Sequence, residues 1–259
     1  MSRILALAVT LPLVALAVAV TARGRSRGDD GPRTPVLVEL FTSEGCSSCP
    51  PADTLLRHLH EAQPVDGADV IVLSEHVDYW NRTGWTDPFS SPAFTDRQTE
   101  YVRRLGAESL YTPQAVVDGG AEVIGNDQPA VAAAVRKAAA RPHAPLAVEV
   151  GDAGAPRLRV AVSGAGVPAG SQILVAIAED DLTVDVRGGE NARRRLRHVG
   201  VVRHLARVGS VSADGRADAR TTLTLDPAWR REALRVVAIA QAPGQGLVTG
   251  LGVARLARP

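Results

Sequence analysis

Residues 36–51 read Val-Leu-Val-Glu-Leu-Phe-Thr-Ser-Glu-Gly-Cys-Ser-Ser-Cys-Pro-Pro. The first six are nearly all apolar and follow a proline, which predicts a short buried strand over 36–41. A polar loop with Cys46 and Cys49 comes next. A helix is predicted over 50–59, because the first N–H groups of a helix have no intrahelical partner and prolines are therefore tolerated there. The stretch thus predicts a strand, a loop with two cysteines, and a helix.

The segments that follow extend this pattern into a known order of elements. A second apolar run, 70–74, predicts another buried strand, so strand, helix and strand form a right-handed βαβ unit with parallel pairing. Further on, the sequence predicts a helix at 92–105, a β-hairpin with a glycine turn at 114–124, and a last helix at 129–140. With a Cys-x-x-Cys pair between the first strand and its helix, this is the order of a thioredoxin-like domain.

The second half of the chain has a different pattern of apolar residues. Short apolar or alternating segments are separated by Gly, Pro and Asp, which is typical of an all-β sandwich. These segments are 146–150, 158–163, 173–178, 182–186, 219–225 and 234–240. The expected fold class is therefore an α/β thioredoxin-like domain at 35–141, followed by an all-β, sandwich-like domain at 145–259.

The N-terminus has the pattern of an export signal. Arg3 precedes an uncharged apolar run over 4–20, and small residues follow it. We expect a signal peptide at 1–22 and a disordered leader at 23–34, with an uncleaved membrane anchor as the alternative. Both interpretations place the folded part outside the cytoplasm, in the periplasm, the cell envelope or the medium.

Composition and charge narrow the classes of partner. Of the 259 residues, 45% are hydrophobic, which excludes a wholly disordered chain, and the formal net charge is +1. This balance gives no reason to expect nucleic acid as a partner, nor a membrane beyond the possible N-terminal anchor.

Cys46 and Cys49 are the two cysteines of the chain. A bridge between them closes a very small loop and removes little chain entropy, which favours a chemical role over a structural one. The positive end of a helix dipole stabilises a thiolate, so we expect Cys46 to be the exposed nucleophile and Cys49 the resolving residue. The nearby carboxylate of Glu44 opposes thiolate formation, and the reduction potential is therefore left open.

Other residues are expected near the cysteines. In thioredoxin-fold oxidoreductases a cis-proline opens the third strand and faces the dithiol, so Thr112 and Pro113 are candidate site residues, with an ordinary turn proline as the alternative. His76 follows the second strand at the edge where such sheets bind ligands, and is a candidate proton shuttle or metal ligand. Alternatively, its ring bonds to loop backbone. Trp80 and Trp85 either line a peptide site or pack the loop.

The sequence resembles the DUF1223 family of secreted, thioredoxin-like bacterial proteins. The matching motifs lie at 38–53 (Val-Glu-Leu-Phe to Ala-Asp), 74–80, 84–85, 87–89, 111–114, 189–191 and 198–203. The resemblance covers most of the mature chain. It implies a fold and a suspected redox role, since the family has no firmly assigned reaction.

Three functions remain open at this point. The first is a thiol–disulfide oxidoreductase, without a cofactor or resident metal, that acts on exported protein thiols or with a redox partner protein. The second is an extracytoplasmic copper-binding protein or chaperone that uses Cys46, Cys49 and His76. Against it, the initiator is the chain's single methionine. The third is a non-enzymatic binding module whose disulfide merely makes a loop rigid.

Overall fold

The structure, a computed structural model, describes residues 33–152 and 156–256. The expected signal peptide at 1–22 lies outside the described residues, as does all but the end of the expected leader at 23–34. In the part of the chain that is described, no helix is long and apolar enough to cross a membrane.

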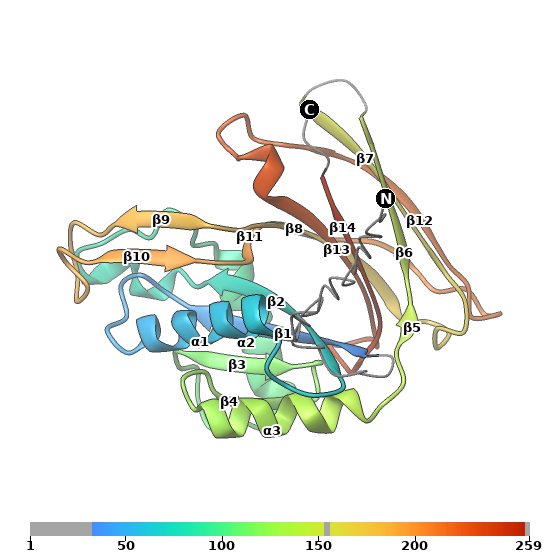
Figure 1. The fold of residues 1–259 in the computed structure, drawn as a ribbon, viewed down its shortest axis with the longest axis horizontal. Helices are drawn as coiled ribbons and strands as arrows, with labels where there is room; N and C mark the ends of the chain where they lie inside the picture. The colour runs from blue at the N-terminus through green and yellow to red at the C-terminus, as the bar shows by residue number, and fades with distance from the viewer. Residues whose placement is uncertain (1–32, 153–155, 257–259) are drawn as a thin grey trace, which may run out of the picture. The chain divides into compact units, whose positions relative to one another are not determined.

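The first half contains the strands and helices that its apolar patterns predict, with ends that differ by at most three residues. The elements are β1 (Thr34–Thr42), α1 (Cys49–Ala62), β2 (Ala68–His76), the 3-10 helix η1 (Tyr79–Thr83), α2 (Pro92–Leu105), β3 (Gln114–Val117), β4 (Ala121–Ile124) and α3 (Gln128–Ala139). β1 pairs with β2 in parallel and with β3 antiparallel, and β3 and β4 form the expected hairpin (Figure 1).

Helices cover both faces of these strands because alternate strand residues point to opposite faces. On one face, the leucines of α1 and the valines of α3 pack on Val36, Val38 and Leu40 of β1. On the other face, Phe94 of α2 packs with Leu37 and with Leu73 of β2. The cysteine-bearing loop is therefore fixed between a strand buried on both faces and a helix that packs on it.

The second half consists of strands and one short 3-10 helix. Its elements are β5 (Ala144–Pro145), β6 (Ala147–Asp152), β7 (Arg157–Gly164), β8 (Gln172–Glu179), β9 (Leu182–Asp185), β10 (Arg195–His198), β11 (Val201–Ser210), β12 (Ala217–Thr224), η2 (Arg231–Ala233), β13 (Leu234–Gln241) and β14 (Val248–Arg255). The apolar segments predicted as strands are confirmed. β5, β10, β11 and β14 were not predicted: β5 has only two residues, and arginines, histidines or glycines interrupt the apolar patterns of the other three.

Strands from both halves join in one sheet. Among the described residues this sheet has nine strands, in the order β4-β3-β1-β2-β11-β8-β13-β14-β5, and the halves meet where Ser74 of β2 pairs in parallel with Val201 of β11. A three-stranded sheet, β12-β7-β6, packs on β8 and β13 through a core of valine, isoleucine, leucine and alanine side chains. The fold is therefore mixed α/β with one large sheet. Whether 35–141 and 145–259 are separable domains stays a prediction.

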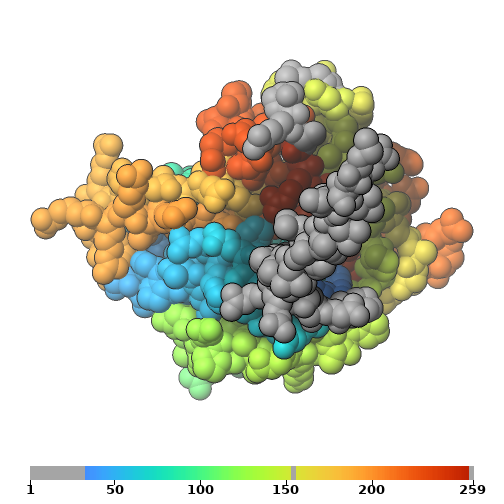
Figure 2. All heavy atoms as spheres, viewed as in Figure 1, coloured from blue at the N-terminus to red at the C-terminus, as the bar shows by residue number. Residues whose placement is uncertain are grey.

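The hairpin of β9 and β10 stands apart from both larger sheets. It projects beside the segment that carries the two cysteines, at the left of the molecule in Figure 2. β10 contacts α1, and the residues between β9 and β10 reach the loop in front of that helix. A late part of the chain thus completes a loop formed by an early part.

Candidate functional site: the disulfide loop

Cys46 and Cys49 form a disulfide, with their Cα atoms 5.5 Å apart. We call residues 43–48, which end at Ser48, the N-cap of α1, the disulfide loop. Both cysteines are fully buried, whereas Ser47 and Ser48 are exposed. The expectation that Cys46 is exposed is therefore wrong for the disulfide form. The reason is packing: an added Cβ on Gly45 would lie 3.1 Å from Trp80 Cβ, so Trp80 lies directly against the loop.

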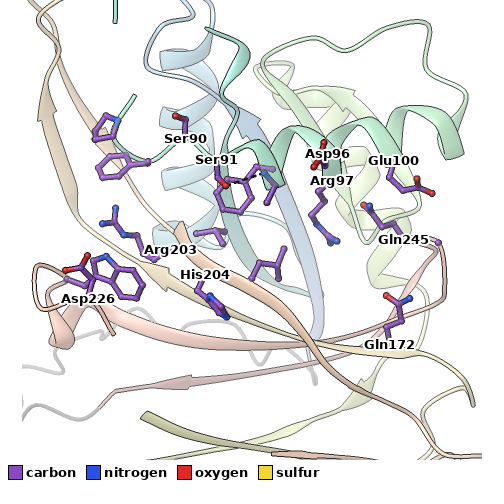
Figure 3. Close-up of a pocket in the computed structure, with 18 residues that line it drawn as sticks. Ser90, Ser91, Asp96, Arg97, Glu100, Gln172, Arg203, His204, Asp226 and Gln245 are labelled. Atoms are coloured by element: carbon purple, nitrogen blue, oxygen red, sulfur yellow. Dashed lines mark hydrogen bonds between the residues drawn. The ribbon is translucent and has the colours of Figure 1, made fainter. Parts of the chain in front are cut away.

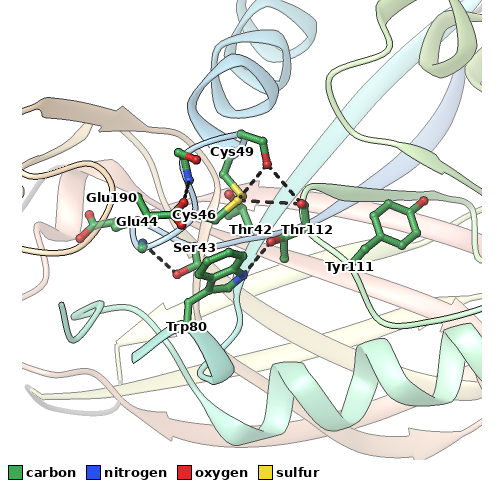
Figure 4. The surroundings of a disulfide bond; sticks show 12 residues. Thr42, Ser43, Glu44, Cys46, Cys49, Trp80, Tyr111, Thr112 and Glu190 are labelled. Atoms are coloured by element: carbon green, nitrogen blue, oxygen red, sulfur yellow. Dashed lines mark hydrogen bonds between the residues drawn. A yellow bond between two sulfur atoms is a disulfide. The ribbon is translucent and has the colours of Figure 1, made fainter. Parts of the chain in front are cut away.

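Thr112 borders the disulfide from the start of the hairpin (Figure 4). Its carbonyl oxygen lies 3.9 Å from Cys46 Sγ and accepts a hydrogen bond of 3.4 Å from Ser48 Oγ. Trp80 Nε1 donates to Thr112 Oγ1 over 2.8 Å. The Thr112–Pro113 peptide bond is cis, as expected. The Thr112 carbonyl thus lies beside Cys46 Sγ, and Trp80 bonds to the same threonine.

Two residues between β9 and β10 hold the disulfide loop from the other side. Asn191 is buried, and its Nδ2 donates to the carbonyl oxygens of Glu44 and Cys46, both over 2.8 Å. The carboxylate of Glu190 accepts the N–H of Ser47 over 2.9 Å. The two residues therefore brace the disulfide loop from the second half of the chain.

Beneath the loop lies a buried group of acids and histidines, which we call the loop cluster: Glu44, Asp53, His76, Asp87 and His198. Glu44 Oε1 lies 3.1 Å from His198 Nε2, and its Oε2 accepts from Trp85 Nε1 over 2.8 Å. Asp53, one helical turn after Cys49 on α1, accepts from Thr42 Oγ1 over 3.0 Å. Its other oxygen is 3.9 Å from His198 Nδ1. The cluster joins residues that are far apart in the sequence.

His76 lies inside this cluster. Its ring is fully buried, and its Nδ1 is 2.7 Å from Asp87 Oδ2, which also accepts the Glu44 N–H over 2.8 Å. His76 therefore reaches the disulfide loop through Asp87, and the expected open position at the sheet edge is wrong. The physical reason is that the residues after β2 fold back and supply Asp87 as an ion-pair partner inside the protein.

The partners in the loop cluster shift one another's protonation. Burial alone would lower the pKa of His76, but the Asp87 carboxylate outweighs it, and the pKa is raised above the ordinary 6.5. Burial would raise the pKa of Asp87, but His76 and two backbone N–H groups hold it below 3.8. Burial raises the pKa of Asp53 despite the attraction of His198 and His76. The cluster therefore contains groups whose charge depends on pH.

The fold and the site define a class: a mixed α/β protein with a disulfide at the N-terminus of a helix and a buried acid–histidine cluster beneath it. The family model described as "Protein of unknown function (DUF1223)" matches residues 37–241, and the chain belongs to this family.

Solved structures give one informative likeness. The crystal structure of a protein from Agrobacterium tumefaciens is 27% identical, with a TM-score of 0.69, over 88% of this chain and 100% of the other. The solution structure of CsgH from R. palustris is 14% identical over 43% of this chain and 91% of the other, and its TM-score of 0.22 carries no argument. No match was found among curated proteins.

Sequence reasoning named Cys46, Cys49, Thr112, Pro113 and His76. The structure places the Thr112 carbonyl beside Cys46, with Pro113 next in the chain after a cis bond, whereas His76 bonds to Asp87. Sequence reasoning missed Asp53, Asp87 and His198 as members of the cluster. All three stand in the motifs shared with the family, at 38–53, 87–89 and 198–203. Their place in these family motifs was the signal by which the sequence could have identified them as site residues. No group of three or more His, Cys, Asp or Glu residues is placed to hold a metal ion in the described part of the chain.

Proposed function

We propose that the protein is an extracytoplasmic thiol–disulfide oxidoreductase with a thioredoxin-like first half. In this proposal Cys46–Cys49 reacts with exported protein thiols or with a redox partner protein. The observation that carries it is the position of the disulfide at the N-terminus of α1, with the Thr112 carbonyl oxygen 3.9 Å from Cys46 Sγ. The parallel β1–α1–β2 unit and the β3–β4 hairpin agree with a thioredoxin-like arrangement.

The disulfide is a weak structural device in this setting. It spans three residues and removes little entropy from the unfolded chain. The loop is already held by Asn191, by Glu190 and by the Glu44 contacts with His198 and Trp85. A bond that adds little to a loop with so many other supports is better explained by its chemistry.

Ser48 supplies a hydrogen bond that the helix terminus lacks. Pro50 and Pro51 have no N–H, so two of the donors that a helix N-terminus normally offers are absent. Ser48 Oγ lies 3.3 Å from Cys46 Sγ and now bonds to the Thr112 carbonyl. When the disulfide opens, this hydroxyl turns to the Cys46 thiolate and lowers the pKa of that thiol, together with the helix dipole.

The exchange is a pair of displacement steps. A substrate thiolate attacks Cys46 Sγ and forms a mixed disulfide, and the Cys46–Cys49 bond breaks with its electron pair on Cys49. A second substrate thiolate then attacks the substrate sulfur and releases Cys46 as a thiolate. Two electrons and two protons pass from the substrate dithiol to the protein, and the reverse sequence reduces a substrate disulfide.

The burial of Cys46 requires the loop to move before the first step. The exposed Ser47 and Ser48 mark the approach, and Trp80 covers the remaining side. Within this proposal His76 is a positioning residue, since it acts through Asp87 on the Glu44 N–H and not by contact with the sulfurs.

The test is alkylation of the reduced protein with iodoacetamide over a range of pH, together with the reduction potential. We expect Cys46 to react faster than Cys49, with a thiol pKa below about 8.5, and a potential above about −300 mV. Ser48→Ala should raise the Cys46 pKa. Ser47→Ala is the matched control, because the Ser47 side chain makes no described contact with sulfur, and it should leave that pKa unchanged.

Other outcomes distinguish the alternatives. Equally slow labelling of both thiols, with a potential below about −300 mV, would contradict the proposal and favour a binding module. Stoichiometric copper on the reduced protein, without exchange of thiols, would favour copper handling by Cys46 and Cys49.

A further inference from the structure

A second concave site lies away from the disulfide. It is a cavity of about 880 Å³ between α2, with the segment before it, and strand β11, and it is closed by loops near Asp226 and Gln245 (Figure 3). This volume is in the range of about 300–1,000 Å³ that is typical of sites for small organic ligands. Both halves of the chain contribute to its walls.

Apolar and aromatic side chains form part of the lining. Phe94 from α2, Leu205 from β11 and Trp229 all face the cavity. The guanidinium of Arg203 lies between two rings, 5.0 Å from the centre of Phe89 and 5.3 Å from the centre of Trp229. These rings already hold one cation, and they give the cavity surfaces that suit an apolar body.

The two arginines of the lining are committed to carboxylates of the protein. Arg97 donates to Glu39 over 2.7 Å, and Arg203 Nε lies 3.5 Å from Glu179. Asp226 also acts on Arg203, where it opposes the lowering of the arginine's pKa by burial. Neither arginine is therefore left to bind an anion.

The remaining charges of the lining are acidic. Asp96 and Glu100 stand one turn apart on the same face of α2, and Asp226 comes from the loop after β12. No ion pair of Asp96 is found among the described residues, and Glu100 pairs with the exposed Arg103. Asp96 is therefore the acid of the lining that is left without a cationic partner in the described part of the chain, which favours a positive ligand beside it.

Two buried polar atoms of the lining also lack a partner. Gln245 Oε1 and His204 Nε2 are both inaccessible to solvent and have no hydrogen bond among the described residues. Buried polar atoms are nearly always hydrogen-bonded, so such a pair indicates a missing partner. Gln245 Oε1 is an acceptor, and burial lowers the pKa of His204, so its ring is neutral and Nε2 can accept as well.

We infer that this cavity binds an organic cation, namely an apolar body that carries an ammonium or guanidinium group. Its charged group would pair with Asp96 or with Asp226, while its apolar part packs on the apolar and aromatic lining, which includes Phe94 and Trp229. The source is either a free amine or a basic side chain of a peptide, which share this chemistry. The inference does not depend on the reactivity of Cys46.

The test is isothermal titration calorimetry of the full chain with three probes of one carbon skeleton: phenylbutylamine, phenylbutanol and phenylbutyrate. We expect the amine to bind about tenfold more tightly than the alcohol or the acid. A hydrogen bond to a charged group contributes about the free energy that a tenfold change in affinity needs. The double variant Asp96→Asn with Asp226→Asn should weaken the amine about tenfold and leave the alcohol unchanged. The double variant Asp66→Asn with Asp69→Asn, two exposed acids away from the cavity, is the matched control and should change neither.

A further titration with a peptide distinguishes a free amine from a basic side chain of a polypeptide as the ligand. Tighter binding of N-acetyl-phenylalanyl-arginine amide than of the amine would identify a basic polypeptide segment as the ligand, and equal or weaker binding would identify a free amine. The inference is overturned if phenylbutyrate binds as tightly as the amine, if the cavity variant binds the amine normally, or if no probe binds at millimolar concentration. All four substituted acids are exposed or at a turn, so loss of folding does not confuse the result.

Discussion

Two buried polar clusters flank the first strands of the sheet, and they are neutralised in different ways. Glu75 and His76 are neighbours on β2 and point to opposite faces. His76 belongs to the loop cluster. Glu75 belongs to a second group, the arginine cluster, whose members come from β1, β2, α2 and β13: Glu39, Glu75, Arg97, Tyr101 and Gln241.

The arginine cluster is organised around one permanent cation. Arg97 Nε donates to Glu39 Oε1 over 2.7 Å, and Tyr101 donates to Glu39 Oε2 over 2.6 Å. Burial and the neighbouring Glu39 raise the pKa of Glu75 well above its usual range, which favours the uncharged form of this carboxyl. Arg97 stays cationic at any moderate pH and forms an ion pair with Glu39.

The loop cluster has imidazoles in place of a guanidinium. Its acids are Glu44, Asp53 and Asp87, and the imidazole rings beside their carboxylates belong to His76 and His198. Imidazole changes charge near neutral pH, whereas guanidinium does not. The contrast indicates that one cluster fixes the fold, while the other makes the support of the disulfide loop dependent on pH.

The largest effect is expected in the arginine cluster. Arg97→Met leaves Glu39 buried without its cation, so the free energy of unfolding at pH 7 should fall by about 3–5 kcal/mol in urea denaturation. Arg103→Met, at an exposed position of the same helix, should change it by less than about 0.5 kcal/mol. Equal losses in the two variants would contradict the view that Arg97 fixes the fold.

A smaller loss is expected where the second half holds the disulfide loop. Asn191→Ala leaves the buried carbonyl of Glu44 without its donor and should cost about 1–3 kcal/mol. The same variant should speed the reduction of the disulfide by a small thiol, because the loop is less firmly held. Asn126→Ala, an exposed asparagine, is the control. A stability loss in Asn191→Ala without faster reduction would show that Asn191 stabilises the fold but does not control the reactivity of the disulfide.

The contribution of His76 to the free energy of unfolding should depend on pH. Its pKa is raised in the folded state, so its contribution is present in full below about pH 6.5 and is lost as the pH rises through the folded-state pKa. The difference in stability between the wild type and His76→Gln should therefore shrink from mildly acidic to alkaline pH in thermal melts.

The neighbours of His76 do not mask this trend. Asp87, with a lowered pKa, contributes stability that is lost only as the pH falls below 3.8. Asp53, with a raised pKa, loses its proton at a cost as the pH rises, and the attraction of charged His76 reduces that cost in the wild type. His58→Gln, on the exposed side of α1, should show no such trend. A difference that stays constant with pH would mean that His76 is not charged in the fold.

The smallest effect is expected at the rim of the loop. Glu190 is exposed, and its hydrogen bonds with Ser47 lower its pKa. Glu190→Gln keeps an acceptor for the Ser47 N–H, so the unfolding midpoint should not move, and reduction of the disulfide should be only slightly faster. A marked change in the unfolding midpoint would show that the hydrogen bond between Glu190 and Ser47 stabilises the fold as the buried contacts of the loop do.

The sequence predicted what depends on local pattern and missed what depends on distant contacts. Helices α1, α2 and α3 and the buried strands of the first half have regular apolar spacing, so their positions were correct. β11 was missed because two irregularities interrupt its pairing with β8, between Val202 and His204 and between Arg207 and Gly209. The apolar alternation of the strand is broken at the same places.

The candidate site divides in the same way. The cysteine pair and Thr112–Pro113 follow from the order of elements, since these positions are set by neighbouring segments. The loop cluster could not be derived, because His198 and Asp87 reach Glu44 only through the tertiary fold. The burial of Cys46 was missed for a similar reason: it depends on how Trp80 packs against Gly45, which spacing alone does not give.

The supports of the disulfide loop also set an order of events during synthesis. Cys46 and Cys49 leave the ribosome almost together, whereas Asn191, which bonds to Cys46, follows 145 residues later. Until then the two thiols of the nascent chain lie close to each other, but Asn191 and His198 have not yet been synthesised. Contacts of such long sequence separation form slowly. A truncated chain that ends before β9 would lack these two supports of the disulfide loop, and we expect its cysteine pair to react faster with reagents than that of the complete protein.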